Sequence, residues 1–542
     1  MIKKLKITNF KGFYGTFELE LNKGINVLVG NNECGKSTIL EAIHLALTGL
    51  YNGRSTRYDI SPYLFNNKAI EEYLDALCKS EKKEPPSIII ELFFEGDDFP
   101  AFEGNYNSEN ANQIAGVRFK IAFADIYKEE YETLIKNDGI KSLPIEYYEA
   151  SWTTFARNNV TVKAIPIKSI LIDSSNYKYN NGSDVYLSRI VKDILETQDI
   201  IAISQAHRNM MDAFAADESI KTINERISGE STVVPGKISI SADMGTKNSW
   251  ENNLVTQVEN VPLSFVGKGA QCIVKTELAL KHKRAQNANI ILLEEPESHL
   301  SFSNLNKLIS SIEETNLDKQ IIITTHSSFV ANKLGLDNLI LLNNKKVATL
   351  RGLQSANYFK KMAGFDTLRL ILCKRAILVE GDSDELVVQR AYRDKNNGRL
   401  PIYDGVDVIS VGLSFLRFLE LAKQLNITVA VVTDNDGDVN ALIKKYEEYE
   451  SSPCIKICYD SVVDVGDLKI GNSEYNYNTL EPKLLKSNSL SLFNRIFNTE
   501  YKSEDELRKY MKHNKTECAL RIFESEENIT YPEYILEAIE YE

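Results

Sequence analysis

The feature that most constrains this chain is a glycine-containing loop between an apolar run and an amphipathic one. The loop reads GNNECGKST over residues 30–38 and fits the pattern G-x-x-x-x-G-K-[ST]. The apolar run 25–29 precedes it and the amphipathic run 39–47 follows it, which predicts a strand, a loop and a helix in that order. Such a loop points backbone N–H groups at phosphates, at a helix N-terminus whose dipole favours anions. The segment therefore predicts a nucleoside triphosphate site.

Two side chains of this loop have predicted roles. Lys36 is expected to reach the terminal phosphates and Ser37 to ligate Mg²⁺. The competing interpretation, an ordinary glycine turn, is disfavoured by the flanking runs. The residues expected to bind ATP here are Gly30, Asn31, Asn32, Gly35, Lys36, Ser37 and Thr38.

Composition narrows the class of protein. A chain of 542 residues predicts about three or four domains. Its net charge of −13 does not indicate a nucleic-acid binder, although a local basic channel is compatible with it. No apolar run approaches the roughly 20 residues of a membrane helix, and the basic N-terminus lacks the apolar core of a signal peptide. Seven scattered cysteines favour a reducing compartment. We expect a cytoplasmic protein without a membrane partner.

A second apolar run, 290–293, ends in two carboxylates, the Walker B pattern. Adjacent residues at the end of a strand point to opposite sides, so the two acids can have different roles. Glu294 is expected to hold the Mg²⁺ shell, and Glu295 to polarise the attacking water.

Three further motifs have the spacing of an ABC-type ATPase. Residues 263–271 form an imperfect signature with one inserted residue, in which Ser264 and Gly267 are the expected nucleotide contacts. Residues 297–300 occupy the D-loop position, and His326 ends the apolar run 321–325 where a switch histidine contacts the γ-phosphate. Each motif alone has an ordinary explanation as surface charge or a capping residue. Their joint order predicts an ABC-type ATPase.

Residues 1–350 resemble the SMC and recombination-repair branch of ABC ATPases, including the opening segment 7–13. In that branch the signature of one subunit completes the nucleotide site of the other. The resemblance therefore implies ATP held between the heads of a homodimer. No long heptad segment separates the loop from the signature, which argues against a coiled-coil arm.

The chain from residue 376 alternates between strand-like and helix-like runs, which predicts a parallel sheet. The strand-like runs are 376–379, 406–411 and 427–433, and the helix-like runs are 384–393 and 414–425. Acidic clusters follow its first and last strands, at residues 380–384 and 434–438. Open α/β sheets place their sites at these strand ends, and carboxylate oxygens suit Mg²⁺ or Mn²⁺. An EF-hand loop is excluded because its sixth and twelfth positions are Val439 and Lys445. Ordinary polar turns remain the alternative.

The two clusters resemble the Toprim domain, whose signature is a Glu-Gly turn followed by D-x-D. An ABC ATPase with a C-terminal Toprim domain is similar to the overcoming-lysogenization-defect (OLD) family of nucleases, including Gabija-type and retron-associated effectors. The resemblance implies phosphodiester hydrolysis with two metal ions. It assigns as metal ligands Glu380, Asp384, Asp434, Asp436, Asp438 and Glu481. Asp384 departs from the glutamate of many relatives. Lys515 resembles the family's late lysine, which could neutralise transition-state charge.

The predicted fold class is α/β, with an ABC-type ATPase head followed by a parallel-sheet Toprim domain. The expected segments are an N-terminal ATPase segment (residues 1–160), a helical dimerisation insertion (161–235), a C-terminal ATPase segment (236–355) and the Toprim domain (370–542).

The function that follows is an ATP-binding, metal-dependent DNA endonuclease or nickase. The resemblance makes anti-phage defence plausible, beside a partner protein or with a retron nucleic acid, in a homodimer or higher homo-oligomer. One alternative is a DNA-binding ATPase clamp in which the Toprim fold is only a scaffold. Another is a topoisomerase or primase, which the ATPase module does not fit.

Overall fold

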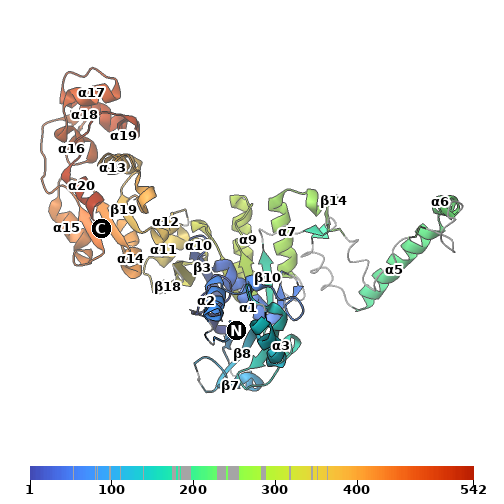
Figure 1. Ribbon diagram of the computed structural model, residues 1–542. Helices are drawn as coiled ribbons and strands as arrows, with labels where there is room; N and C mark the ends of the chain where they lie inside the picture. Colours follow the sequence, from blue (N-terminus) through green and yellow to red (C-terminus); the bar gives the residue numbers. More distant parts are fainter. Residues whose placement is uncertain are drawn as a thin grey trace. The chain divides into compact units, whose positions relative to one another are not determined.

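A computed structural model gives the fold of this chain in two compact units (Figure 1). The first contains residues 1–28 and 32–325, and the second contains residues 29–31 and 326–542. Among the residues that the structure describes, no helix is long and apolar enough to cross a membrane. The description covers the chain except residues 53, 80, 82, 97–98, 110–111, 138–139, 174–178, 181–182, 185–196, 229–239, 242–254, 282–288, 316–318, 344–345, 351, 363 and 542.

The first unit opens with an antiparallel sheet. Its strand order is β2-β1-β6-β8-β7, and β9 pairs with β8. Side chains along β2 alternate between buried and exposed positions, as expected for a sheet with one face on a core. The strands are β1 (Ile2–Thr8), β2 (Thr16–Glu20), β6 (Ile88–Phe94), β7 (Glu103–Gly104), β8 (Ile114–Phe123) and β9 (Tyr148–Thr154).

A parallel sheet carries the nucleotide-binding motifs of this unit. Its strands β10 (Ser169–Asp173), β15 (Ile290–Glu294), β16 (Gln320–Thr324) and β3 (Ile25–Gly30) pair in that order. The middle strands are buried along nearly their whole length, which explains their continuous apolar sequence. Helix α1 (Lys36–Thr48) follows β3.

The position of β10 corrects one predicted boundary. The helical insertion was expected over 161–235, yet residues 169–173 pair with β15 inside the ATPase sheet. The helices of this region are α5 (Thr197–Ala216) and α6 (Glu218–Ser228). Within the predicted insertion, residues 174–178, 181–182, 185–196 and 229–235 lie outside the described residues. The helical insertion therefore begins after β10.

The second unit begins with α10 (Ser328–Leu334) and the antiparallel hairpin of β17 (Leu339–Asn343) and β18 (Lys346–Thr349). Two short helices, α11 (Ala356–Lys361) and α12 (Thr367–Leu372), follow. The ATPase segment predicted to end at residue 355 thus crosses the border between the compact units, because residues 326–355 belong to the second one.

The predicted parallel sheet is confirmed in the second unit. Four parallel strands lie in the order β20-β19-β21-β22. They are β19 (Arg375–Val379), β20 (Val406–Ser410), β21 (Thr428–Val432) and β22 (Ile455–Cys458). The helices after the strands are α13 (Asp382–Lys395), α14 (Phe415–Leu425) and α15 (Val439–Tyr446).

A group of C-terminal helices completes the core of this unit. Apolar side chains of α13 pack in one cluster with those of the sheet and of the last helices, including Val388, Phe493 and Ile535. The helices are α16 (Leu480–Ser487), α17 (Leu490–Phe497), α18 (Glu504–His513), α19 (Lys515–Glu524) and α20 (Glu533–Glu540). Because α16 and α19 belong to this core, they bring late segments of the sequence to the sheet.

Candidate functional site

The phosphate-binding loop has the predicted context: β3 ends at Gly30 and α1 begins at Lys36. Gly35 has a φ of 101°, in the left-handed region that favours glycine. A Cβ at this position would also lie 2.6 Å from Cζ of Phe13. Lys36 is buried at the start of the helix, whereas Ser37 is exposed. Backbone conformation and packing both require glycine at position 35.

The two Walker B carboxylates occupy different backbone settings. Glu294 is the last residue of β15, whereas Glu295 has a φ of 42°. The Glu295 N–H donates to the carbonyl oxygen of Thr324 at 3.1 Å and to its hydroxyl oxygen at 3.2 Å. The hydroxyl of Ser298 in turn donates to the Glu295 carboxylate at 3.3 Å. The ends of β15 and β16 therefore hold Glu295 in place.

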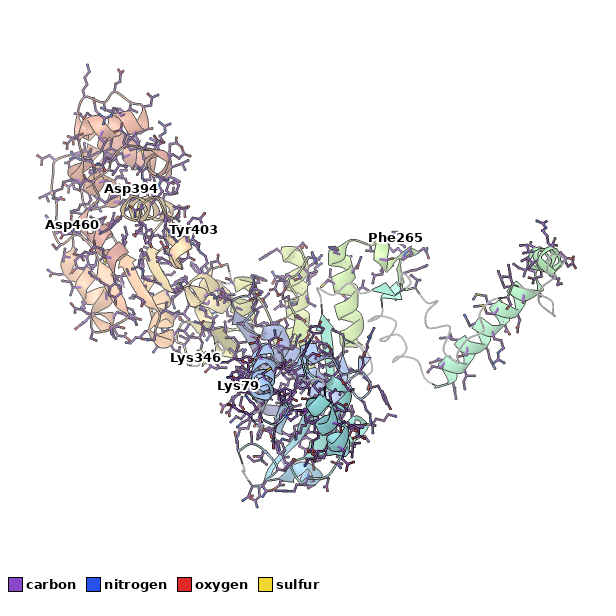
Figure 2. The ribbon with its side chains drawn as sticks, viewed as in Figure 1. Lys79, Phe265, Lys346, Asp394, Tyr403 and Asp460 are labelled. Carbon is purple, nitrogen blue, oxygen red and sulfur yellow. The ribbon has the colours of Figure 1, made fainter. Side chains whose placement is uncertain are left out.

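The signature segment forms a short 3₁₀ turn that leads into a helix. Ser264 lies in the turn and Gly267 directly precedes α7 (Lys268–Lys281). Phe265, labelled in Figure 2, is 81% exposed. A Cβ on Gly269 would lie 2.5 Å from the carbonyl oxygen of His299, so the start of α7 packs against the D-loop.

The switch histidine belongs to the second compact unit. His326 is exposed and follows the buried residues of β16. Ser327, the next residue, caps α10, and its hydroxyl accepts a hydrogen bond from the N–H of Val330 at 3.4 Å. A γ-phosphate contact of His326 stays a prediction, as do those of Ser264 and Gly267.

In the second unit, acidic side chains surround a cavity of about 270 Å³ at the carboxyl ends of β19 and β21. The predicted site residues Glu380, Asp384, Asp434, Glu481 and Lys515 all line it. The other lining residues are Gly381, Ser383, Gly412, Leu413 and Leu480. The tertiary structure thus brings together five predicted residues that lie far apart in the sequence, from position 380 to position 515.

The first acidic cluster lies at the start of α13. A carboxylate oxygen of Asp384 accepts a hydrogen bond from the N–H of Gly381 at 3.0 Å. This contact fixes the Asp384 side chain at the N-terminus of the helix, where the helix dipole favours a negative charge. Burial and the neighbouring charge of Glu481 nevertheless raise the pKa of Asp384 to about 6.

The pKa of Asp434 is raised further than that of Asp384. Burial, followed by the nearby carboxylates of Asp384, Glu481 and Glu380, raises its pKa to about 8. Desolvation and like-charge repulsion both disfavour the ionised form.

Lys515 supplies one positive charge at the cavity. Its Nζ lies 3.2 Å from a carboxylate oxygen of Glu481. Partial burial acts to lower the pKa of Lys515, but the charges of Glu481 and Asp434 outweigh it and raise the pKa above its ordinary value. The side chain is still about half exposed, so it can reach a ligand from solvent.

Asp436 and Asp438 lie beside the cavity and do not line it. The amide of Asn476 donates to the Asp436 carboxylate at 2.8 Å. Asp438 caps α15, since its carboxylate accepts from the N–H of Ala441 at 3.0 Å. The capping contact gives Asp438 a structural role, and metal ligation by these two residues stays a prediction.

The donor set fits a divalent cation by its chemistry. Carboxylate oxygens are the preferred ligands of Mg²⁺ and Mn²⁺, and burial together with the neighbouring carboxylates raises the pKa of Asp434. Within the described residues of the chain, no three His, Cys, Asp or Glu side chains are arranged so that they hold a metal ion together. The carboxylates would therefore have to approach one another around an added cation, which would offset their repulsion.

Sequence reasoning missed the supports of this site. Asn435, inside the second acidic cluster, is buried and bonded to the segment after β22. Lys483, which follows Glu481 by two residues in the sequence, is buried and forms ion pairs with Asp460 and Asp464. A lysine so close to a predicted ligand was the one signal available, because the sequence does not show that its side chain is buried.

The fold and the two sites define an ABC-type ATPase joined to a Toprim domain. Residues 1–331 match the family described as "AAA ATPase domain", and residues 371–436 match "Overcoming lysogenization defect protein-like, TOPRIM domain". The chain therefore belongs to the AAA ATPase domain family, and its second unit carries a segment that matches the Toprim domain of OLD-like proteins.

Two relatives extend over most of the chain. Endonuclease GajA of Bacillus cereus (strain HuB5-5) is 24% identical over 539 residues, covering 80% of this chain and 76% of the relative. The Retron Ec83 probable ATPase of Escherichia coli is 25% identical over 420 residues, covering 66% of this chain and 74% of the relative. An SMC head bound to the C-terminal winged-helix domain of ScpA is 17% identical with a TM-score of 0.35, covering 66% of this chain and 99% of that one.

Proposed function

We propose that this protein is an ATP-regulated, metal-dependent DNA endonuclease or nickase that acts in anti-phage defence. The observation that carries the proposal is the cavity at the ends of β19 and β21, where four carboxylates and Lys515 converge. The similarity to Endonuclease GajA supports a DNA substrate. The defence role rests on that relative and on the retron ATPase.

Within this proposal the cavity carboxylates hold Mg²⁺ or Mn²⁺, which would supply Lewis acidity for the attack of water and the departure of the 3′-oxygen. Glu380, Asp384 and Asp434 would bind the cations from the sheet side, and Glu481 from α16. Lys515 would face the scissile phosphate and neutralise charge that develops in the transition state. Its ion pair with Glu481 orients the ammonium group towards the cavity.

The ATPase unit would regulate this chemistry. Gly30, Lys36 and Ser37 would bind ATP and its Mg²⁺, Glu294 and Glu295 would serve the hydrolytic water, and heads would pair into a homodimer through the signature. The exposed position of Phe265 beside Ser264 is compatible with a signature that meets a second subunit. Nucleotide binding would then either license or restrain cleavage, two outcomes that a cleavage assay separates.

The test is cleavage of supercoiled plasmid with Mg²⁺ or Mn²⁺, with and without ATP. We expect wild type to nick or linearise the plasmid, and Glu380→Ala and Asp434→Ala to lose this activity. Lys36→Ala, compared with and without ATP, gives the direction of the nucleotide effect. Asp467→Ala is the matched control, because Asp467 is an exposed carboxylate of the same unit that does not line the cavity.

The second candidate is an ATPase clamp that binds DNA and uses its Toprim fold as a scaffold. The absence of three carboxylates already arranged around a cation, among the described residues, is the observation that favours it. Plasmid that stays intact under every metal and nucleotide condition, together with retained DNA binding, would support the clamp. Equal cleavage by wild type and Asp434→Ala would place the chemistry elsewhere.

A further inference from the structure

The side-chain amide of Asn435 links the acidic turn, residues 434–438, to the segment that follows β22. Asn435 is 3% exposed. Its side-chain NH₂ donates to the carbonyl oxygen of Asp460 and, at 3.2 Å, to that of Val462. Its side-chain oxygen accepts from the N–H of Gly437 at 3.0 Å. The position of the acidic turn therefore depends on the segment that follows β22.

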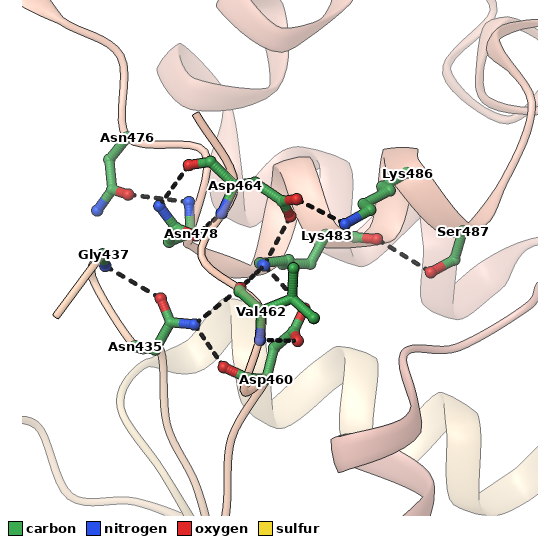
Figure 3. A network of polar contacts seen from close by, with 10 residues as sticks. All are labelled: Asn435, Gly437, Asp460, Val462, Asp464, Asn476, Asn478, Lys483, Lys486 and Ser487. Carbon is green, nitrogen blue, oxygen red and sulfur yellow. Dashed lines mark hydrogen bonds and ion pairs between the residues drawn. The ribbon is translucent and has the colours of Figure 1, made fainter. Parts of the chain in front are cut away.

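That segment, residues 460–464, is held by the buried ammonium group of Lys483 (Figure 3). Lys483 is only 2% exposed. Its Nζ lies 2.7 Å from each of three oxygens, a carboxylate oxygen of Asp460, one of Asp464 and the carbonyl oxygen of Val462. The ammonium group donates hydrogen bonds to the Val462 carbonyl and to the Asp464 carboxylate, and the Asp460 carboxylate pairs with the same charge.

A second connection runs from the same segment to Asp436. Asp464 and Asn478 exchange two hydrogen bonds: the Asp464 N–H donates to the Asn478 side-chain oxygen at 2.7 Å, and the Asn478 NH₂ donates to the Asp464 carbonyl at 2.9 Å. Two residues earlier, the amide of Asn476 donates to Asp436 at 2.8 Å. The segment held by Lys483 thus supports the acidic turn at two points, Asn435 and Asp436.

Helix α16 joins this support to the cavity. It carries Glu481, which lines the cavity, and Lys483, which does not. Helix α16 therefore positions the Glu481 carboxylate directly, and it positions the acidic turn through the segment 460–464. Carboxylates that repel one another need such a support if they are to stay in place for a cation.

We propose that Lys483 is a positioning residue that sets the acidic turn, with Asp434 and Asp436, at the distance from Glu481 that cation binding requires. This inference rests on the proposed nuclease function. Lys483 acts through its neighbours, because all three of its contacts are with the segment 460–464. Removing the charge of Lys483 frees the segment 460–464, and the acidic turn then no longer keeps its position relative to α16.

The test compares Lys483→Met with Lys486→Met. Lys486 is the matched control. Its Nζ lies 2.6 Å from the other carboxylate oxygen of Asp464, but its side chain is 53% exposed. Two quantities are measured on the full-length protein: Mn²⁺ binding, from the electron paramagnetic resonance signal of free Mn²⁺, and the Mn²⁺ concentration for half-maximal plasmid cleavage. We expect Lys483→Met to weaken Mn²⁺ binding about 10- to 100-fold, as loss of a group supporting metal ligands typically does. Lys486→Met should stay within about twofold, as for an exposed ion pair.

Should Lys483→Met fail to fold, Asp460→Asn decides the question. It keeps the volume of the side chain and the backbone carbonyl that holds Asn435, and it removes one charge from the surroundings of Lys483. We expect it to weaken Mn²⁺ binding in the same direction, by more than Lys486→Met does. If the wild type binds Mn²⁺ and cleaves plasmid, and the folded variant binds Mn²⁺ equally well, the proposed role of Lys483 is overturned and the proposed function stands. A wild type that neither binds Mn²⁺ nor cleaves plasmid means that the proposed function has failed.

Discussion

The two sites of this protein are built in opposite ways. The phosphate-binding loop is one short continuous segment, residues 30–38, and its decisive groups are backbone N–H groups held by glycine and a helix start. The Toprim cavity gathers side chains from Glu380 to Lys515, across a sheet and two late helices. The first site depends on local conformation, and the second depends on packing that keeps like charges together. Substitutions should therefore damage the two sites by different routes.

The largest effect is expected from Lys515→Ala on cleavage. Loss of one group that stabilises transition-state charge typically costs about 100-fold or more in rate. Because Lys515 is half exposed, protein stability should hardly change. Initial rates of plasmid nicking at saturating Mg²⁺ measure this, with Lys509→Ala as an exposed lysine control. Full activity in Lys515→Ala would remove this lysine from the catalytic site.

Gly35→Ala should be the most damaging single change in the nucleotide site. The new Cβ would meet Phe13 at 2.6 Å in a backbone conformation with a φ of 101°. A loop that leaves its phosphate-binding conformation to relieve strain of about 1–3 kcal/mol loses roughly 5- to 150-fold in ATP affinity. Fluorescent-nucleotide titration measures it. Gly12→Ala is the control, since its Cβ would have no neighbour within 4 Å. Equal losses in both variants would contradict a local origin.

The crowded carboxylates predict a pH dependence of stability in metal-free protein. Asp434 keeps its proton up to about pH 8 when folded, whereas its ordinary pKa is 3.8. Between these values the folded state binds more protons, so the free energy of unfolding falls as pH rises towards 8. The melting temperature in EDTA should drop by several degrees from pH 6 to pH 8.

Asp434→Asn isolates this group. It should flatten that section of the pH dependence, because an amide does not ionise in this range. Added Mg²⁺ should raise the melting temperature of wild type more at pH 8 than at pH 6, since it binds the ionised carboxylates. A wild-type stability curve identical to that of Asp434→Asn would show that the pKa of Asp434 is not raised in solution.

The smallest effects are expected from alanine substitutions at two nearby glycines of the signature, Gly267 and Gly269. Gly269→Ala should lower the melting temperature, because its Cβ would lie 2.5 Å from the carbonyl oxygen of His299, at a cost of about 1–3 kcal/mol. Gly267→Ala should leave it unchanged, since nothing lies within 4 Å. If the signature binds ATP, Gly267→Ala should still slow ATP hydrolysis. Thermal melts and phosphate release measure the two effects side by side.

Residue patterns predicted most of the element order. The strands at 376–379 and 406–411 and the helix at 414–425 were expected within a residue of their observed bounds. The boundary at residue 161 was wrong, because β10 pairs with β15, whose residues come much later in the chain. A short apolar strand in a polar region gives no sign of such a distant partner. The sequence likewise could not separate Asp434, which lines the cavity, from Asp438, which caps a helix.

By itself, the sequence determined the phosphate-binding loop, the order of the ATPase motifs and the two acidic clusters after parallel strands, because each depends on residues close together in the chain. Only the tertiary structure decided which acids share a cavity, that Glu481 and Lys515 join them, and that Lys483 is buried against the segment 460–464. Those facts depend on how α16 and α19 pack against the sheet. Burial then raises the pKa of Asp384 and of Asp434, since desolvation acts on a group only once its surroundings are in place.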